Sequence, residues 1–508
     1  MDLLAARAAA TPTKIALHLP DSGEAMDFRT LDTRAARAAR WLVGRGLQAG
    51  ERIALLMENR AELIELAFAA QRAGLYYTPI SNHLRPAEIA YILADAGARL
   101  LVATPETAAA AAAALADRPE LPRFIAGGDV PGFASYEAVR NSQDPVPPLP
   151  ERPVGRDLLY SSGTTGRPKG VKMPLLPPEM RANPPVHPSW HFYGFSADTV
   201  YFSPGPLYHA APHRYVLRVV QEGGSCIIPR KFTAAAALAA IERYRVTHSQ
   251  WVPTMFHRLL ALPEAERHRY DLASHRVAIH AAAPCPVALK RAMIAWWGPI
   301  LYEYYAGSEA FGITVIDSPT WLAHPGSVGK PLSGAVHILG EDGRELPPTE
   351  VGTISFSGGP PFEYLNAPEK TAAAYDAAGR ASYGDLGWLD AEGFLYLSDR
   401  RADLIISGGV NIYPAEVEDT LIQHPLVADA AVIGLPDAEF GEQVAAIVQP
   451  HNPAAADPAT AAALIAFCHE HLAGPKCPRR IFFTDALPRS EAGKLLRRLL
   501  KEQYRSAA

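Results

Sequence analysis

Cysteine is scarce in this sequence and shows no pairing pattern. Its four cysteines, Cys226, Cys285, Cys468 and Cys477, are scattered over 508 residues, and no two of them have CxxC spacing. Small secreted domains stabilised by disulfides use cysteine far more densely. The distribution therefore suits free, buried thiols in a reducing compartment.

Long apolar runs and a strong net charge are also missing. No uncharged apolar stretch reaches the ~18 residues that span a bilayer. The N-terminal stretch has Asp2 before any cation and Arg7 inside its apolar part, so it makes a poor signal peptide. The formal net charge of -5 gives no reason to expect a nucleic-acid partner. We therefore expect a cytoplasmic protein without an integral membrane segment.

The composition is that of a folded globular protein, with 48% hydrophobic and 20% charged residues. The length suggests roughly three structural units. In the first half, helical patterns alternate with short apolar runs, which predicts a doubly wound parallel sheet. The helical patterns cover 28–47, 61–75 and 85–98, and the strand patterns cover 52–57, 76–81 and 99–104.

A second alternating series runs from about residue 200 to about residue 305. From about 326 to 356, short strands with glycine turns replace the helices, which predicts a small β-barrel-like subdomain. A compact unit of about a hundred residues follows. The predicted fold is α/β, with two doubly wound sheets and the β-barrel-like subdomain in a large N-terminal domain (1–400), and a small α+β C-terminal domain (401–508).

The segment YSSGTTGRPKG (160–170) concentrates glycines, hydroxyl side chains and one lysine. The residues before and after it have strand patterns, so we expect a loop at the tip of a hairpin. It is not a Walker loop, which needs GxxxxGK[ST] followed by a helix. Its glycines would still free backbone N–H groups to face phosphate oxygens. On these residues alone, an ordinary turn and a polyphosphate-binding loop both remain open.

Two segments resemble motifs of the adenylate-forming superfamily, which comprises acyl- and aryl-CoA synthetases, firefly-type luciferases and peptide-synthetase adenylation domains. SSGTTGRPKG is similar to the phosphate loop of that superfamily, and YYAGSEAFG is similar to its aromatic-Gly-x-Thr-Glu motif. The second motif departs from the pattern at Ala306, where glycine is usual, and at Ser308, which replaces threonine. The resemblance implies that Tyr305 stacks on adenine, that Ser308 contacts phosphate and that Glu309 binds Mg²⁺, which prefers oxygen ligands.

Other motifs of the superfamily follow in the expected order. HAAAPCP resembles the stretch whose backbone borders adenine, and YGDLGWLD resembles the motif whose aspartate, here Asp385, binds the ribose hydroxyls. LSDRRADLIISGGVNIYPAEVE is similar to the hinge motif, with Arg400 expected near the ribose and the α-phosphate. PRSEAGKLLRR carries the C-terminal lysine, Lys494. The resemblance covers essentially the whole chain.

The resemblance implies one nucleotide site to which both predicted domains contribute. The expected catalytic residues are Lys494, Glu309 and Thr165. The residues expected to bind ATP or AMP are Ser161, Ser162, Gly163, Thr164, Thr165, Gly166, Lys169, Ala282, Ala283, Pro284, Tyr305, Ser308, Asp385, Arg400 and Lys494.

The acid substrate is expected in an apolar pocket beside the nucleotide. PLYHAAP resembles the motif that places His209 at the acyl pocket, and the neighbouring segments WHFYGF, VYFSPGPLYH and SQWVPTMF are rich in aromatic residues. The residues expected to line this pocket are His209, Trp251, Ala306, Gly307 and Gly312. By contrast, the core is expected to hold Phe192, Phe195 and Phe202.

Coenzyme A and the hinge are assigned on the same resemblance. The residues expected to contact coenzyme A are Ser407, Gly408, Gly409, Lys476 and Arg479. Ala402 stands at the hinge position, where the superfamily usually has Asp or Lys. The small C-terminal domain is expected to be mobile, because in the superfamily it rotates between two half-reactions.

The implied activity is that of an AMP-forming, ATP-dependent carboxylic acid–CoA ligase that uses Mg²⁺. PLYHAAPHRY lacks the aspartate that anchors an amino group in peptide-synthetase domains. We therefore expect a fatty, alicyclic or aryl acid. Two alternatives remain, an acyl-AMP ligase that loads a carrier protein and a non-catalytic nucleotide-binding regulatory module. Assembly into a homodimer is also left open.

Overall fold

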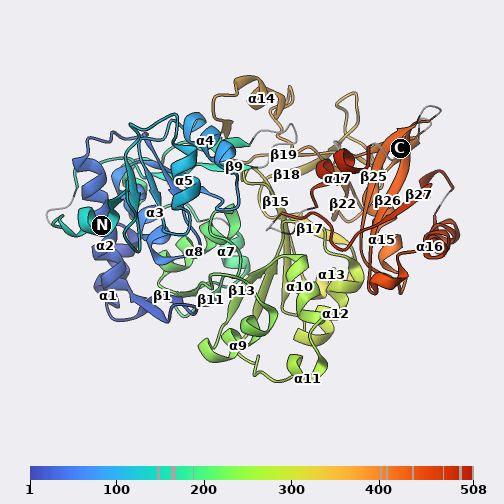
Figure 1. The fold of residues 1–508 in the computed structure, drawn as a ribbon, viewed down its shortest axis with the longest axis horizontal. Coiled ribbons are helices and arrows are strands. Elements are labelled where there is room, and N and C mark those ends of the chain that lie inside the picture. The colour runs from blue at the N-terminus through green and yellow to red at the C-terminus, as the bar shows by residue number, and fades with distance from the viewer. Residues whose placement is uncertain are drawn as a thin grey trace.

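The computed structural model describes most of the chain. It covers residues 1–145, 149–161, 168–186, 188–400, 403–407, 410–437, 440–472, 474–490, 493 and 495–505. In Figure 1 the N-terminal half, blue to green, fills the left and lower parts, and the C-terminal unit, orange to red, lies at the right. No helix in these ranges combines the length and the apolar character needed to cross a membrane.

The first sheet is parallel. Its described strands have the order β7-β6-β5-β3-β4-β8, and each neighbouring pair is parallel. The expected alternation of helices and strands is confirmed. The strands are β3 (Arg52–Leu56), β4 (Tyr76–Ile80), β5 (Leu101–Ala103), β6 (Arg123–Ile125), β7 (Ala134–Ser135) and β8 (Arg156–Asp157). The helices are α1 (Leu3–Ala10), α2 (Phe28–Gly44), α3 (Ala61–Ala73), α4 (Pro86–Asp95), α5 (Ala108–Ala114) and α6 (Tyr136–Asn141).

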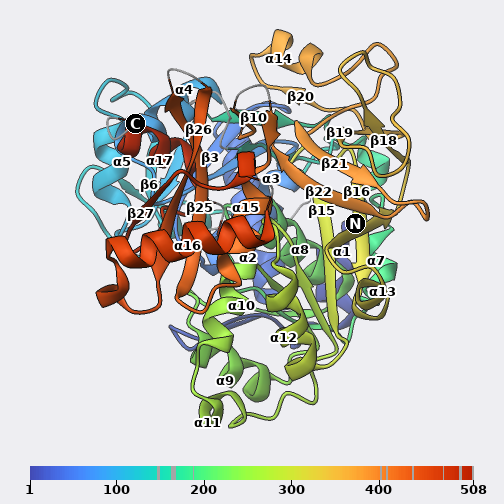
Figure 2. The ribbon, with the colours of Figure 1, turned by 90° about the vertical axis from the view of Figure 1, so that its right-hand side faces the viewer.

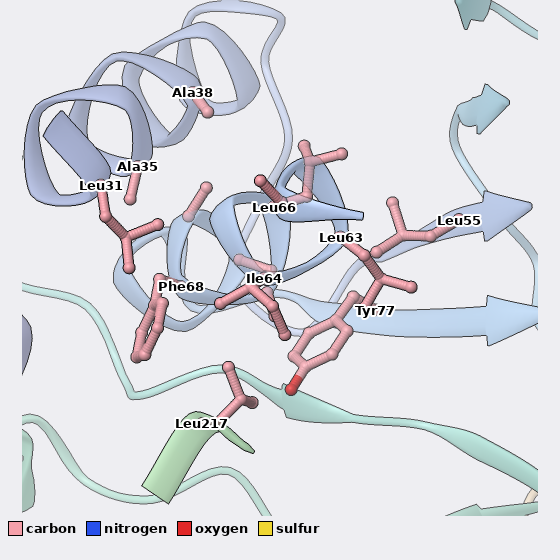
Figure 3. Close-up of a cluster of buried hydrophobic side chains, with 14 of the residues drawn as sticks. Leu31, Ala35, Ala38, Leu55, Leu63, Ile64, Leu66, Phe68, Tyr77 and Leu217 are labelled. Atoms are coloured by element: carbon pink, nitrogen blue, oxygen red, sulfur yellow. The ribbon is translucent and has the colours of Figure 1, made fainter. Parts of the chain in front are cut away.

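The core of this part is shared with the second sheet. Helix α2 begins where the Asp27 carboxylate accepts a hydrogen bond from the Thr30 N–H, and its apolar residues recur at helical spacing. Figure 3 shows Leu31 and Ala35 of α2 facing α3, and Leu217 of helix α8 (Ala210–Glu222) reaching the same cluster. One hydrophobic cluster therefore joins the two sheets.

The second sheet is parallel in its middle part and antiparallel at both ends, since β2 pairs with β1 in the antiparallel direction. The described strands follow the order β2-β1-β12-β11-β13-β14-β15-β16-β17-β22-β21-β19-β18. Strands from β1 to β15 pair in parallel, and all later pairs are antiparallel. The expected strand-rich subdomain is thus an antiparallel extension of this sheet.

Helices and strands alternate in the same way from β11 to β15. The strands are β1 (Ile15–Leu19), β2 (Glu24–Asp27), β11 (Val200–Phe202), β12 (Ser225–Ile227), β13 (His248–Trp251), β14 (Val277–His280), β15 (Leu301–Ala306), β16 (Ile313–Asp317), β17 (Ser327–Pro331), β18 (Ala335–Leu339), β19 (Gly352–Ser357), β21 (Asp385–Leu389) and β22 (Leu395–Arg400). The helices are α7 (Ser189–Phe192), α8, α9 (Ala234–Tyr244), α10 (Pro253–Leu260), α11 (Glu264–Arg267), α12 (Val287–Trp297), α13 (Ser318–Ala323) and α14 (Pro368–Ala373), with a 3₁₀ turn at Pro178–Arg181.

The strands on either side of the glycine-threonine segment form an antiparallel hairpin, as expected. Strands β9 (Leu159–Ser161) and β10 (Lys169–Lys172) are antiparallel, and Lys169 pairs with Ser161. On its other edge β10 pairs with β20 (Glu363–Tyr364). This pairing places β10, the strand that follows the glycine-threonine segment, beside residues 363–364.

The C-terminal unit is a separate α+β layer. Its sheet has the order β24-β23-β26-β25, with β27 on β26. In Figure 2 α16 lies across the face of this sheet that is turned to the viewer. Alternate residues of β25 face opposite sides, so Val432 packs with α15 and α16 while Ile433 packs with Leu500 of α17. The elements are β23 (Ile405–Ser407), β24 (Val410–Ile412), β25 (Val427–Asp437), β26 (Gly441–Pro450), β27 (Arg480–Phe483), α15 (Pro414–Ile422), α16 (Pro458–His471) and α17 (Arg497–Tyr504), with 3₁₀ turns at Pro453–Ala455 and Gly474–Lys476.

A buried ion pair in the first part gives a stability prediction. The Glu65 carboxylate is fully buried and accepts hydrogen bonds from Tyr136 and from Nη1 of Arg140, the latter at 3.1 Å and 3.2 Å. Arg140→Met leaves this carboxylate without its cation, so we expect a loss of about 3–5 kcal/mol. Chemical denaturation measures it. Combining Glu65→Leu with Arg140→Met should restore most of the loss, and equal losses in the single and double variants would contradict this account.

Candidate active site

A cleft of about 3390 Å³ lies between two parts of the chain, which are called here the large part (up to β22) and the small part (from Asp403 and β23 onward). Residues of both parts line it. The lining segments of the large part include residues that directly follow β13, β14 and β15. Because these strands are parallel neighbours, their carboxyl ends meet at one edge. The small part contributes Asp403, Glu418, Arg489 and Gly493.

Two of the predicted nucleotide residues touch each other across the second sheet. Tyr305 is the penultimate residue of β15 and Asp385 begins β21, and the Tyr305 hydroxyl donates to Oδ2 of Asp385 at 2.7 Å. Both line the cleft. The aromatic ring and the carboxylate assigned to adenine and ribose are therefore neighbours, although 80 positions separate them.

Glu309 lies at the same edge and has a partner that the sequence did not indicate. The Tyr364 hydroxyl donates to Oε1 of Glu309 at 2.7 Å, and Nζ of Lys169 sits 4.9 Å from the centre of the Tyr364 ring. Burial and Lys370 lower the pKa of Lys169, and Glu309 opposes that shift. Tyr364 thus connects the lysine of the hairpin with the proposed Mg²⁺ ligand.

The segment expected to border adenine follows β14 and lines the cleft with Ala282, Ala283 and Pro284. Ala282 has a φ of 76°, a conformation that alanine rarely adopts, so the surroundings must hold it. A buried ion pair holds the following helix α12 against β15, because Nζ of Lys290 donates to Oε2 of Glu303 at 2.6 Å. This pair ties the segment before α12 to the strand that carries Tyr305.

His209 lies just before α8 and lines the cleft. Burial lowers its pKa to about 4, so the ring is neutral near pH 7. Its Nε2 is buried and has no hydrogen-bond partner among the described residues. A neutral ring with one free nitrogen is available to accept or donate a hydrogen bond in the cleft.

Trp251, Gly307 and Gly312 have packing roles in addition to their place at the cleft. Trp251 is 1% exposed, packs against Phe202 and donates from Nε1 to Oγ of Ser249 at 2.5 Å. A Cβ on Gly307 would lie 2.2 Å from the Tyr383 ring, and a Cβ on Gly312 would lie 2.2 Å from the Phe356 ring. These two glycines therefore make room for aromatic rings of the strand-rich subdomain.

The wall of the cleft beyond His209 is aromatic. Tyr215 stacks on Tyr304 with ring centres 6.3 Å apart, and Nε2 of Gln250 donates to the Tyr304 hydroxyl at 3.3 Å. Trp190 stacks on Phe195 at 3.8 Å. Of these residues, Trp190, Tyr215, Gln250 and Tyr304 line the cleft. Each lies in a segment quoted in the sequence analysis, but none was predicted individually as a pocket residue.

Of the three phenylalanines expected in the core, Phe202 is 2% exposed and confirms the expectation, whereas the prediction for Phe192 was wrong. Phe192 is 40% exposed, because it closes the short helix α7 and presents one ring edge to Tyr302. Phe195 is partly buried against the large core cluster.

The coenzyme A candidates are spread over the small part. Ser407 ends β23 and is buried, whereas Nζ of Lys476 is paired with the Glu416 carboxylate at 2.7 Å and 2.8 Å. Arg479 lies 4.0 Å from the centre of the Phe440 ring. The described residues that line the cleft do not include Lys476 or Arg479.

Several candidates lie outside the described residues, namely Ser162, Gly163, Thr164, Thr165, Gly166, Ala402, Gly408, Gly409 and Lys494. The backbones of Ser161 and Arg400 are described as strand, but not their side chains. Gly493, next to Lys494, is described. A Cβ on Gly493 would lie 2.7 Å from Oγ1 of Thr254 on α10, so the C-terminal segment meets the large part at that point.

Glu309 fits a Mg²⁺ ion bound together with phosphates. The residues described here contain no group of three His, Cys, Asp or Glu side chains that could hold a metal. Mg²⁺ does not require one, since it commonly binds through one or two carboxylates and substrate phosphates. The largely buried Glu309 carboxylate at the cleft, near the cation of Lys169, matches that chemistry.

Comparison with known proteins gives a consistent result. A family model for AMP-binding enzymes matches residues 4–361, and the model for the C-terminal domain of these enzymes matches residues 416–494. The sulfoacetate–CoA ligase of Cupriavidus necator is 33% identical over 97% of this chain and 96% of that protein. A feruloyl-CoA synthase of an Amycolatopsis species is 34% identical over 95% of this chain and 94% of that protein.

Solved structures are similar to this chain over its full length. The crystal structure of ATP-bound MatB from Rhodopseudomonas palustris has a TM-score of 0.85 at 29% identity and covers all of both chains. The mixed α/β architecture with a large sheet domain and a small C-terminal domain is thereby confirmed. The chain belongs to the family of AMP-binding enzymes, among its acid–CoA ligases.

Proposed function

We propose that this chain joins an apolar carboxylic acid to coenzyme A in two steps, through an acyl-AMP intermediate formed from ATP. The observation that carries the proposal is the meeting of Tyr305, Asp385, Glu309 and Lys169 at one edge of one cleft. Relatives with full-length similarity are named as CoA ligases, and a similar structure holds ATP. These names support the reaction type.

Each segment of the cleft has a proposed part in binding ATP. The Tyr305 ring stacks on adenine opposite Ala282–Pro284, and the Asp385 carboxylate accepts hydrogen bonds from the ribose hydroxyls. The hairpin loop and Lys169 surround the phosphates, with Ser308 contacting them. Glu309 holds Mg²⁺, which neutralises phosphate charge when it is bound. The domain boundary near residue 400, with Ala402 as the hinge, is part of the same proposal.

In the first step the protein has to stabilise developing negative charge, and it need not supply a nucleophile of its own. A carboxylate oxygen of the acid attacks the α-phosphorus of ATP, and the bond to the pyrophosphate oxygen breaks. Negative charge gathers on the α-phosphate, where Lys494 and the loop N–H groups would be preorganised donors. In the second step the sulfur of coenzyme A attacks the acyl carbonyl, its proton is lost, and AMP departs.

The aromatic wall indicates the class of acid. Trp190, Tyr215 and Tyr304 present rings to the cleft, and Gln250 supplies one neutral polar group. Such a surface suits an aryl acid or another apolar acid of similar bulk. Since the two relatives are named for acids as different as sulfoacetate and ferulate, their names do not transfer to this chain.

A screen of carboxylic acids for pyrophosphate release, with and without coenzyme A, tests the proposal. We expect release that depends on an added apolar acid, and an acyl-CoA thioester when coenzyme A is present. Pyrophosphate release that is indifferent to every acid would end the ligase proposal. Acid-dependent release without any thioester would replace it by the carrier-loading alternative.

Lys494 supplies a prediction that separates the two steps. By analogy with the removal of one transition-state donor, Lys494→Ala should slow adenylation about 10²–10³-fold. Thioester formation from supplied acyl-adenylate should change far less, because the C-terminal domain that carries the lysine is expected to rotate between the two half-reactions and to withdraw the lysine from the phosphate. Single-turnover rates of the two half-reactions measure the difference. Equal losses in both would rule out this role for the lysine.

The hydrogen bond between Tyr305 and Asp385 supplies a prediction on ATP affinity. Tyr305→Phe keeps the ring but removes the donor that holds the carboxylate, so we expect KM for ATP to rise about tenfold or more. KM for the acid should hardly move. Tyr304→Phe, on the same strand, is the matched control and should leave KM for ATP near that of the unmodified enzyme. An unchanged KM for ATP in Tyr305→Phe would refute the assignment.

A further inference from the structure

One guanidinium joins two segments of the cleft that are far apart in the sequence. Arg214 lies on α8, and each of its three nitrogens donates a hydrogen bond. Nε and Nη2 donate to Oδ2 of Asp157 at 3.0 Å and 2.7 Å, and Nη1 donates to the carbonyl oxygen of Ser308 at 3.0 Å. Its partners are 57 and 94 positions away.

Both partners stand next to proposed phosphate-binding groups. Asp157 is on β8, immediately before the strand β9 that leads into the glycine-threonine segment. Ser308 directly precedes Glu309, whose side chain is held on its other side by Tyr364. The Arg214 side chain therefore connects the incoming strand of the hairpin to the backbone beside the proposed Mg²⁺ ligand.

The segment that carries Glu309 needs such support. It connects β15 to β16 and includes Ala310, whose φ is 57°. Because alanine rarely adopts a positive φ, contacts with the surrounding structure must hold the backbone in this conformation. At one side of the turn the Tyr383 ring fills the space beside Gly307. The hydrogen bond from Arg214 of α8 to the Ser308 carbonyl is a second restraint on this turn.

We propose that Arg214, anchored by Asp157, is a positioning residue that sets the placement of Ser308 and Glu309 for Mg·ATP. This inference rests on the proposed function. The main competing role is direct contact of the Arg214 cation with the acid, since Arg214 lines the cleft. The described lining does not include Asp157, whose side chain is 12% exposed, so a change at Asp157 tests positioning without touching substrate.

The pair stays charged across the working pH range. Burial alone would raise the pKa of Asp157, but Arg214 and Arg156 lower it to about 2. The Asp157 carboxylate thus remains an acceptor at any pH at which the enzyme is assayed. Asp157→Asn removes its charge while keeping nearly the same size, and Arg214→Lys keeps the charge but cannot bridge two partners in the same way.

Equilibrium binding of ATP, measured by calorimetry with and without Mg²⁺, is the test. We expect Asp157→Asn and Arg214→Lys each to weaken Mg·ATP binding about tenfold or more, since each breaks hydrogen bonds that involve a charged group. Affinity for metal-free ATP and KM for the acid should change little. The double variant should lose no more than the worse single variant, because both changes break one connection.

Arg218 provides the matched control on the same helix. It lines the cleft and is paired with Glu222 in its own helix rather than with the Ser308 segment. Arg218→Lys should bind Mg·ATP like the unmodified enzyme. Normal Mg·ATP binding by Asp157→Asn, or an effect of Arg214→Lys confined to KM for the acid, would overturn the inference. An unmodified enzyme without acid-dependent pyrophosphate release would instead refute the proposed function itself.

Discussion

The common edge at which parallel strands end is the constraint on which the candidate site depends. Strands β13, β14 and β15 pair in register, so the residues after each strand arrive together although the chain travels through α10 and α12 between them. Groups that must surround one ligand can then sit on three separate connections, each free to carry its own chemistry. The antiparallel strands beyond β15 add Asp385 to the same edge.

Aromatic rings pack around the turn between β15 and β16, in addition to the hydrogen bonds made by its backbone. Gly307 is required beside Tyr383 and Gly312 beside Phe356, and Tyr364 reaches Glu309 from the hairpin sheet. From the sequence, small residues near a motif are readily interpreted as making space for a substrate, as was done for Gly307 and Gly312. Here the two glycines line the cleft and also admit rings of the strand-rich subdomain, so this subdomain packs against the turn that carries Glu309 and also supplies Asp385.

Much of the fold was predictable because its signals are local. The periodicity of segments such as 61–75 and 52–57 identified α3 and β3, and the residues flanking 162–167 identified the hairpin of β9 and β10. Contacts between distant segments were not predictable. Tyr364 lies outside every quoted segment, and Arg214 lies in PLYHAAPHRY, where nothing indicated its partner. The partners of the two residues are 55 and 94 positions away. The glycine-rich strand patterns from about residue 326 to 356 likewise predicted a barrel-like subdomain. In the structure, the pairing of β17 with β22 makes these strands part of the second sheet.

The two parts of the chain have different proposed roles, because the large part binds the nucleotide and the small part supplies the catalytic lysine. This division affects the direction of the reaction. The contacts that organise the proposed nucleotide site, Tyr305 to Asp385, Tyr364 to Glu309 and Arg214 to Ser308, all lie within the large part. The proposed catalytic lysine comes from the small part, beside Gly493, which rests on Thr254. A cation that stabilises the transition state of adenylation stabilises it equally for the reverse attack of pyrophosphate. On the proposed function these contacts let the large part hold the adenylate, so withdrawal of the small part would slow the return to ATP without releasing the intermediate, and so favour transfer to the thiol.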